Sequence, residues 1–509
     1  MQGSLKLPNS SPENDFKSLL LSLVIGGTAV IALVLFFLIA DSDLGIIAFG
    51  GIIAIGLTFA IFMRPQWGAY ILVVTIVTNV STLLTRNGYP SINKPVVGVV
   101  FIAIAAGYLW NRQQNQLTLR LGFTELLLFI MGGVWFLSAM GARDSSAAFL
   151  QVTDYFKNFI ILICIIYALR TPQQWKRAVW LLILATAVPA ALGVYQIITG
   201  NYTQDFGGLM VNVVQQVVDG AYEARLSGPI REPNFYGQIL AYVLVLAVYR
   251  VLDEKSLWLK GVAMAAAFCM ALTAVYTYSR GAFVTIVVIM ALIAIERRIR
   301  PSLIISIGLL VGLLLLFLPS TYSERISSIT LLNPNETFES RIYEDASFRG
   351  RYSEILSGLL MFAEHPVLGV GIGNYDVNYQ DYSSRLGLEY RFDDREAHSL
   401  YVESLAETGA LGFLSLLGVI ATTFMGLRAA RQKITRLPKY AHLYPWFTSI
   451  HFALLSYMFS SIALHGDFMR YLFLLWALAV SAMHLTEQLV SDEGILIDEA
   501  GLNEEGAAA

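Results

Sequence analysis

The sequence is poor in charged residues. They make up 14% of the 509 residues, whereas hydrophobic residues make up 56%, and a soluble chain carries roughly a quarter charged residues. So few polar groups cannot cover the surface of a globular protein of this length. The hydrophobic residues also come in runs of about 17–25, the length that crosses a bilayer as a helix. The composition therefore predicts a polytopic integral membrane protein.

Cysteine and net charge are also scarce. The only two cysteines, Cys164 and Cys269, lie in separate apolar runs, so we expect neither a disulfide nor a metal site built on thiols. The formal net charge of −3 argues against nucleic acid as a partner. We predict no cleavable signal peptide, because the first apolar run, near 19–40, is too long and lacks a small-residue cleavage site.

Fourteen apolar runs are candidates for transmembrane helices. Two are short, and the last two could merge or shift, so the sequence predicts an all-α fold with about 12 to 14 spans. The runs lie near residues 19–40, 44–63, 66–85, 95–110, 123–140, 152–169, 174–198, 235–252, 256–278, 281–296, 301–318, 400–427, 445–463 and 467–486.

The distribution of lysine and arginine predicts the orientation. With a cytoplasmic N-terminus, these residues concentrate in the cytoplasmic connections, and few remain in the early short loops outside. Both termini are then cytoplasmic. The chain divides into a cytoplasmic tail at 1–18, a membrane domain of about 11 spans at 19–318, a large extracytoplasmic loop at 319–397, C-terminal spans at 398–486 and an acidic cytoplasmic tail at 487–509.

Three external segments carry arginine but no lysine: the loop 199–234, the turn 279–280 and the long segment 319–397. The guanidinium group is a planar fork that binds phosphate or carboxylate through two hydrogen bonds. The choice of arginine therefore indicates recognition of such a group. Ordinary ion pairing is the alternative in the long segment, which is also rich in acidic residues.

Within the long segment, residues 351–364 have helical periodicity and predict an amphipathic helix on the outer membrane face, ending at His365-Pro366. The glycines of 369–373 follow; we expect them to allow a close backbone approach to the membrane domain rather than to bind a nucleotide. The next helix is predicted to run unbroken to about Arg431 and to project beyond the bilayer, with His398 near its outer lip.

Four blocks of sequence resemble a known family. The segment 398–412 reads HSLYVESLAETGALG and fits the pattern His-(Asn/Ser/Gln), nine residues, Gly, two residues, Gly. The blocks before it are RYSEILSGLLMFAEHPVLGVGIGNY at 351–375, TYSRGAF at 277–283 and RLSGPIREPNFYG at 225–237. Together they resemble the bacterial O-antigen ligase/O-antigen polymerase superfamily of membrane glycosyltransferases.

The resemblance implies transfer of a glycan from undecaprenyl pyrophosphate to an acceptor hydroxyl, on the periplasmic face of the bacterial inner membrane and without metal, nucleotide sugar or other cofactor. The acceptor would be a lipid-linked glycan in a polymerase, lipid A-core in a ligase, or a protein in a related branch. It also implies that His398 is catalytic and that Arg280 binds pyrophosphate. For the loop arginine, Arg225 and Arg231 both remain candidates, with a slight preference for Arg231, which precedes a predicted helix start at Glu-Pro-Asn.

Three further residues are weaker candidates. Asp154 and Lys157, three residues apart, could pair on one helix face or line a cavity for the acceptor. Glu407 could orient His398 or accept a hydrogen bond from a sugar hydroxyl.

The main alternative function is a secondary transporter, of bicarbonate or another small solute, because carriers also have many spans. Carriers usually have internal repeats and interrupted helices near the midplane. The two halves of this sequence show no repeat, and its charged motifs gather at one external lip, which favours an enzyme. A scaffold protein, a third possibility, would leave His398 without a role.

Overall fold

The computed structural model describes residues 43–112, 121–218, 221–300, 346–387, 395–464, 466 and 469–507. This part of the chain is mostly helical, as predicted. The predicted spans near 19–40 and 301–318 and the N-terminal tail lie outside the described residues.

Six of the described helices are long and apolar enough to cross a membrane. A seventh span results if α3 (Gln66–Val77) and α4 (Val80–Arg86), bent by 67° relative to each other, form one broken helix. The six are α7 (Ser145–Ala168), α8 (Pro172–Thr199), α9 (Pro233–Asp253), α10 (Leu257–Val275), α17 (Leu400–Thr435) and α19 (Met469–Ala507). The protein is therefore a multi-pass membrane protein.

Five further helices occupy most of the other predicted runs. They are α2 (Asp43–Met63), α5 (Asn93–Arg112), α6 (Phe123–Ala139), α11 (Arg280–Glu296) and α18 (Tyr444–Ser460). The total of 12 to 14 spans and the orientation of the chain stay predictions.

Two helices form the centre of the bundle. The apolar windows of α9 and α19 are 83% and 72% buried, whereas those of the other four spans are 28–44% buried. α9 packs against α8, α10, α11 and α18, and α19 packs against α7, α17 and α18. The outer helices carry exposed apolar side chains such as Phe268 and Met425, which a membrane protein turns towards lipid.

Local signals explain where the helices near the site begin. Asp144 caps α7 by accepting hydrogen bonds from the backbone N–H groups of Ser146 and Ala147. Ser279 caps α11 by accepting from Ala282. α9 starts at Pro233 behind the cap Glu232, which confirms the helix start predicted at Glu-Pro-Asn.

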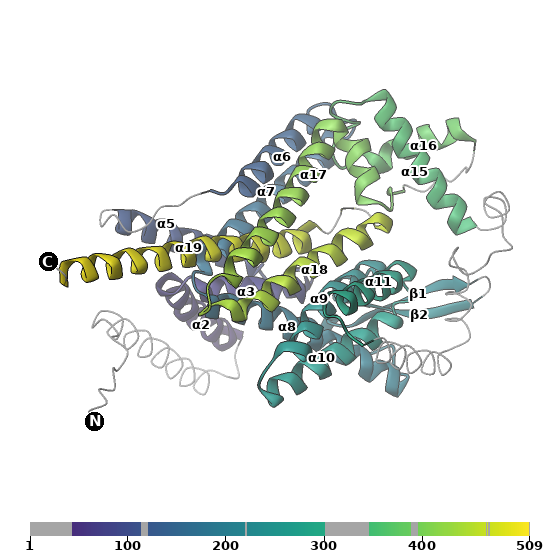
Figure 1. Cartoon of the computed structure of the whole chain (residues 1–509). Coiled ribbons are helices and arrows are strands. Elements are labelled where there is room, and N and C mark those ends of the chain that lie inside the picture. The colour runs from purple at the N-terminus through teal and green to yellow at the C-terminus, as the bar shows by residue number, and fades with distance from the viewer. Residues whose placement is uncertain are drawn as a thin grey trace.

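The all-α prediction is wrong for one segment. Within the loop 199–234, β1 (Val211–Val218) and β2 (Ala221–Gly228) pair as an antiparallel hairpin. β1 is rich in valine, which favours strands because its branched side chain packs well on a pleated surface. In Figure 1 the hairpin lies at the right-hand end of the molecule.

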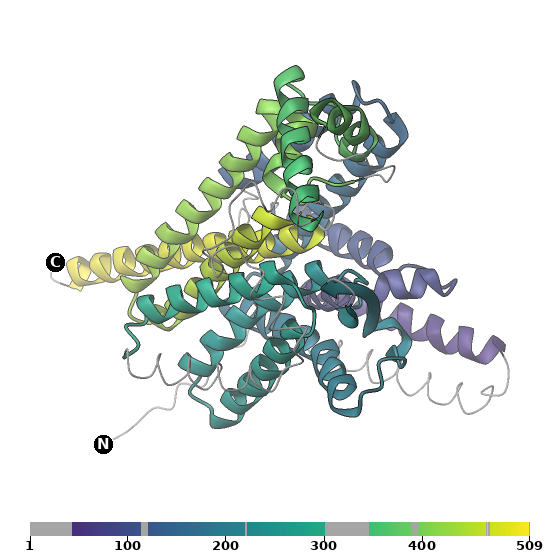
Figure 2. The same ribbon diagram turned by 90° about the vertical axis from the view of Figure 1, so that its right-hand side faces the viewer.

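The long segment contributes two helices, α15 (Ala346–Glu364) and α16 (Tyr375–Leu386). α15 confirms the helix predicted at 351–364 and its end before His365-Pro366; α16 was not predicted. α15 packs against α16 and α17 and leaves Ile355 and Leu359 exposed on its other side. Both helices lie at the same end of the molecule as the hairpin (Figure 1), and Figure 2 views the molecule from that end.

Candidate active site

His398 lies immediately before the first turn of α17 in a strained backbone conformation. Its φ is +45°, in the left-handed region that few non-glycine residues adopt. Arg231 (φ +69°) and Tyr278 (φ +52°), which precede α9 and α11, share this feature. Such strain persists only where the surrounding structure enforces it, and it clusters at functional sites. Three segments singled out by sequence motifs are therefore held in costly conformations.

A buried carboxylate faces the imidazole of His398. Nδ1 of His398 lies 3.1 Å from Oε2 of Glu354 on α15 and 3.1 Å from the backbone oxygen of Glu396. The other carboxylate oxygen of Glu354 accepts a hydrogen bond from Nη1 of Arg395 at 3.1 Å. The side chain of Glu354 is 1% exposed and that of His398 is 29% exposed. Glu354 was not predicted, because nothing in the sequence marks it among the acidic residues of the long segment.

The loop after α15 is locked to α17 by a set of backbone hydrogen bonds, which we call the glycine interlock (residues 366–371 and 406–411). The N–H groups of Val370 and Gly371 donate to the carbonyls of Ala406 and Glu407, at 2.9 and 3.1 Å. In the opposite direction, the N–H groups of Ala410 and Leu411 donate to the carbonyls of Pro366 and Val367, at 2.8 and 3.3 Å. The glycine-rich run thus makes the predicted close backbone approach.

The glycine interlock corrects the prediction that α17 is unbroken. Gly409 has φ +61° and ψ −161°, so the helix is interrupted there. A Cβ on Gly409 would lie 2.4 Å from the carbonyl carbon of Val367, and one on Gly369 would lie 2.2 Å from that of Glu407. Only glycine fits at either position, and the break fixes the short helical segment that follows His398 against the loop.

Glu407 belongs to the same interlock. Its Oε1 accepts a hydrogen bond from the backbone N–H of Tyr375 at 2.9 Å, and its backbone oxygen accepts one from Oγ of Ser138 at 2.7 Å. With 4% exposure, it anchors the start of α16 to α17. The carboxylate 3.1 Å from Nδ1 of His398 is that of Glu354, and a role of Glu407 towards His398 or a sugar hydroxyl stays a prediction.

Arg225, on β2, is buried and bonded to neutral partners. Its Nε donates to the backbone oxygen of Thr277 at 2.8 Å, Nη1 to Oε1 of Gln215 at 2.7 Å and Nη2 to Oδ1 of Asn234 at 2.9 Å. The residue is 4% exposed. It therefore ties the hairpin to the start of α9 and to the turn before α11.

Arg231 differs from Arg225 both in its exposure and in its bonding. It is exposed, and among the residues that the structure describes its guanidinium makes no hydrogen bond or ion pair. Its strained backbone fixes the turn between the hairpin and α9. Of the two candidates for the loop arginine, Arg231 has the more accessible guanidinium.

Several arginines near the hairpin influence one another. Burial lowers the pKa of Arg225 to about 10; the charge of Glu232 opposes this shift, and those of Arg351 and Arg280 add to it. Arg280 is the first residue of α11 and is half-buried. Arg351 stands one helical turn before Glu354 on α15. The arginines of three motifs thus create positive potential close to the helix that contacts His398.

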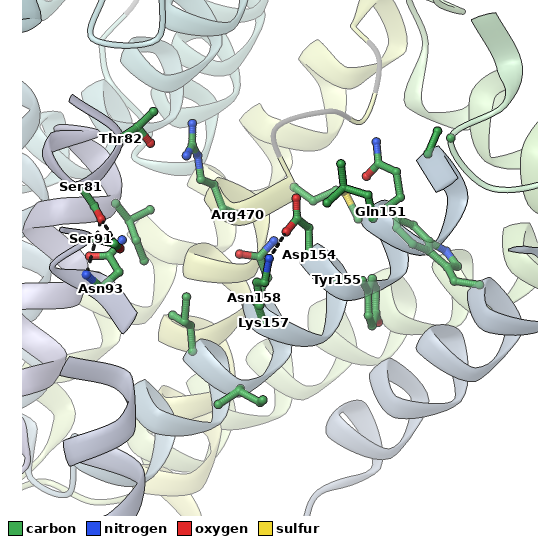
Figure 3. Close-up of a pocket in the computed structure, with 18 of the residues that line it drawn as sticks. Ser81, Thr82, Ser91, Asn93, Gln151, Asp154, Tyr155, Lys157, Asn158 and Arg470 are labelled. Carbon is green, nitrogen blue, oxygen red and sulfur yellow. Dashed lines mark hydrogen bonds and ion pairs between the residues drawn. The ribbon is translucent and has the colours of Figure 1, made fainter. Parts of the chain in front are cut away.

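A cavity of about 820 Å³ opens beside this site. Asp154 and Lys157 line it and form an ion pair of 2.7 Å with each other; binding of an acceptor by these residues stays a prediction. Figure 3 shows them on α7, facing Arg470 of α19 and, across the cavity, Ser81 and Asn93. The lining also includes Glu396, two residues before His398, and Glu403. Its mixture of charged, amide, hydroxyl and aromatic groups suits a polar ligand with many hydroxyls.

The comparisons with known proteins agree with the geometry. Residues 265–417 match a family model described as O-antigen ligase. The matched range includes Arg280, Glu354, His398 and the glycine interlock, whereas the hairpin and α7 lie outside it. No curated protein matches the chain. The match gives no support to a transporter, and it supports the assignment of this chain to the O-antigen ligase/polymerase family.

Proposed function

We propose that this protein is a metal-independent glycosyltransferase that moves a glycan from undecaprenyl pyrophosphate to an acceptor hydroxyl on the extracytoplasmic side of the bacterial inner membrane. The observation that carries the proposal is the arrangement around α15. One turn of this helix bears Arg351, whose charge acts on Arg225, and Glu354, which contacts His398. Arginines suited to pyrophosphate and a histidine suited to a hydroxyl thus flank the same helix.

In the proposed step, Nε2 of His398 takes the proton of the acceptor hydroxyl while its oxygen forms a bond to the anomeric carbon of the donor glycan. The bond from that carbon to the pyrophosphate oxygen breaks, and its electron pair leaves with undecaprenyl pyrophosphate. The configuration at the anomeric carbon inverts. The imidazolium then returns its proton to solvent or to the departing pyrophosphate, so the enzyme is regenerated.

The arginines act on the leaving group. Negative charge grows on pyrophosphate as the bond breaks, so guanidinium groups aimed at it stabilise the transition state more than the ground state. Arg280 and Arg231 are the proposed ligands, and Arg225 is the alternative to Arg231. General-base catalysis by His398 would contribute about 10²–10⁴ in rate.

The cavity beside α7 is the proposed acceptor site. Lys157, Asp154 and Arg470 line it and can exchange hydrogen bonds with sugar hydroxyls. The acceptor decides between a polymerase, for O-antigen or exopolysaccharide, and an O-antigen ligase. We favour a polymerase, because the long segment is rich in tyrosine and arginine, residue types that suit extended glycan contacts.

The test is a deletion of the gene in its native host, complemented with wild type or with His398→Ala. Undecaprenyl-linked glycans are extracted and sized. We expect lipid-linked intermediates to accumulate and only wild type to clear them. Single repeats would identify a polymerase, and long carrier-linked chains would identify a ligase. A normal profile with His398→Ala at wild-type abundance would refute the catalytic role of His398 and return the transporter to consideration.

A further inference from the structure

The hydrogen-bond acceptors around Nδ1 of His398 determine which ring nitrogen carries the proton. Nδ1 is hydrogen-bonded to the carbonyl oxygen of Glu396 at 3.1 Å. Oε2 of Glu354 lies 3.1 Å from the same nitrogen as a buried negative charge, but it makes no hydrogen bond within the described part of the chain. Neither oxygen can donate. In a neutral imidazole only one nitrogen is protonated, so the hydrogen bond to the Glu396 carbonyl requires the proton to be on Nδ1, and the Glu354 carboxylate beside it favours the same tautomer. Nε2 then has the lone pair that a general base needs.

We infer that Glu354 is a positioning residue that holds His398 in the tautomer with a basic Nε2 and stabilises the imidazolium formed when that nitrogen takes a proton. The inference rests on the proposed function and extends it to a residue on another helix, 44 positions earlier in the chain. A carboxylate that fixes the tautomer of a catalytic histidine is an established device in serine hydrolases, where it is supplied by an unrelated fold.

The surroundings of Glu354 suit this role. A buried carboxylate must be paired to remain charged, and Arg395, 3.1 Å away, supplies the positive charge. Three residues of one short segment therefore surround Glu354. Arg395 neutralises its carboxylate, Glu396 accepts a hydrogen bond from Nδ1 through its carbonyl, and His398 contributes the imidazole. The hydroxyl of Tyr375 donates to the backbone oxygen of Glu354, which helps to fix this turn of α15.

Replacing Glu354 by glutamine tests the tautomer directly. Arginine only donates hydrogen bonds, so the amide oxygen of Gln would face Arg395. The amide NH₂ would then face Nδ1, where it opposes a protonated Nδ1 and favours the tautomer with the proton on Nε2. Shape is preserved, the negative charge beside the ring is removed, and only the carbonyl of Glu396 still favours the proton on Nδ1, so the population with a basic Nε2 falls. Glu354→Asp keeps the carboxylate, so it should recover part of the activity.

The experiment uses purified full-length protein in proteoliposomes, with lipid-linked glycan extracted from the deletion strain as substrate. We expect Glu354→Gln to lower kcat by about 10²-fold and to change KM for the lipid-linked glycan less than about twofold, because the substrate contacts remain. Glu354→Asp should fall between wild type and Glu354→Gln. The control is Glu364→Gln on the same helix, which removes an exposed carboxylate paired with Arg385 and should leave kcat unchanged.

The double variant Glu354→Gln/His398→Ala separates positioning from a purely structural role. If Glu354 acts through His398, the double variant is no slower than His398→Ala alone, because residues that act as a unit are not additive. Multiplied effects, or a wild-type kcat for Glu354→Gln, would overturn the inference while leaving the proposed function intact. A wild-type kcat for His398→Ala would instead refute the proposed function. If Glu354→Gln fails to fold, Glu354→Asp takes its place, and a Glu354→Asp/His398→Ala variant slower than His398→Ala alone would overturn the inference.

Discussion

The hairpin and the glycine interlock both hold site residues, but by opposite means. In the hairpin, one buried guanidinium, that of Arg225, joins three separate segments through side-chain hydrogen bonds. In the interlock, two stretches of backbone bond to each other with no room for a side chain between them. Removing the guanidinium of Arg225 should therefore destabilise the hairpin, whereas adding a single methyl group should destabilise the interlock.

The largest effect is expected in the interlock. Gly409→Ala places a methyl group 2.4 Å from the carbonyl carbon of Val367 and also demands a φ of +61°. The left-handed conformation and the overpacking together should destabilise the protein by about 3 kcal/mol or more. Thermal unfolding in detergent, followed by size-exclusion chromatography, measures the loss.

Gly261→Ala is the matched control. Gly261 lies within α10, and a Cβ there meets nothing within 4 Å. Alanine is favoured over glycine inside a helix by roughly 0.5–1 kcal/mol, so this variant should be at least as stable as wild type. Equal stability of Gly409→Ala and Gly261→Ala would contradict the interlock.

The next effect distinguishes the two loop arginines. Arg225→Gln leaves the buried carbonyl of Thr277 and the half-buried side-chain oxygens of Gln215 and Asn234 without this donor, which should destabilise the protein by about 2–3 kcal/mol. Arg231→Gln should change stability by less than about 0.5 kcal/mol but slow glycan transfer by about 10²–10³. The measurements are thermal stability and turnover of the lipid-linked glycan for each variant. A stable but inactive Arg225→Gln would make Arg225 the pyrophosphate ligand instead.

The smallest effect on stability is expected in the cavity. Asp154 and Lys157 are each more than half exposed, and an exposed pair of this spacing contributes only about 0.3–0.5 kcal/mol. Lys157→Gln should therefore leave the unfolding temperature unchanged. If the cavity binds the acceptor, the variant should raise the apparent KM for the acceptor about tenfold, as expected for loss of one charged hydrogen bond. An unchanged KM would remove Lys157 from the acceptor site.

The sequence predicted those features that depend on local pattern. Apolar runs predicted the six long spans, periodicity predicted α15, and Glu-Pro-Asn predicted the start of α9. The hairpin was missed although Asp219-Gly220, a common turn signal between two strand-prone runs, stands in the loop. The roles of His398, Arg280, Arg231 and Arg225 stay predictions that the experiments above address.

Features that depend on contacts between distant segments could not be predicted. Glu354 meets His398 across 44 residues, and no periodicity within α15 marks it among the other acidic residues of the long segment. The helix from 398 to about 431 was predicted to be unbroken, whereas a loop packs at Gly409 and breaks α17. Such contacts follow from how α15 and its loop pack on α17, which only the three-dimensional structure gives.

The break at Gly409 also bears on how the chain enters the membrane. An interrupted helix exposes backbone N–H and C=O groups, and each one left unpaired in hydrocarbon costs several kcal/mol. Here residues 366–371 supply the missing partners, so that loop takes the place of a turn of helix. Insertion of α17 should consequently be coupled to docking of the loop, so that α17 and residues 366–371 fold together as one unit. Shortening the loop should therefore leave the break in α17 without its hydrogen-bond partners and destabilise the inserted helix.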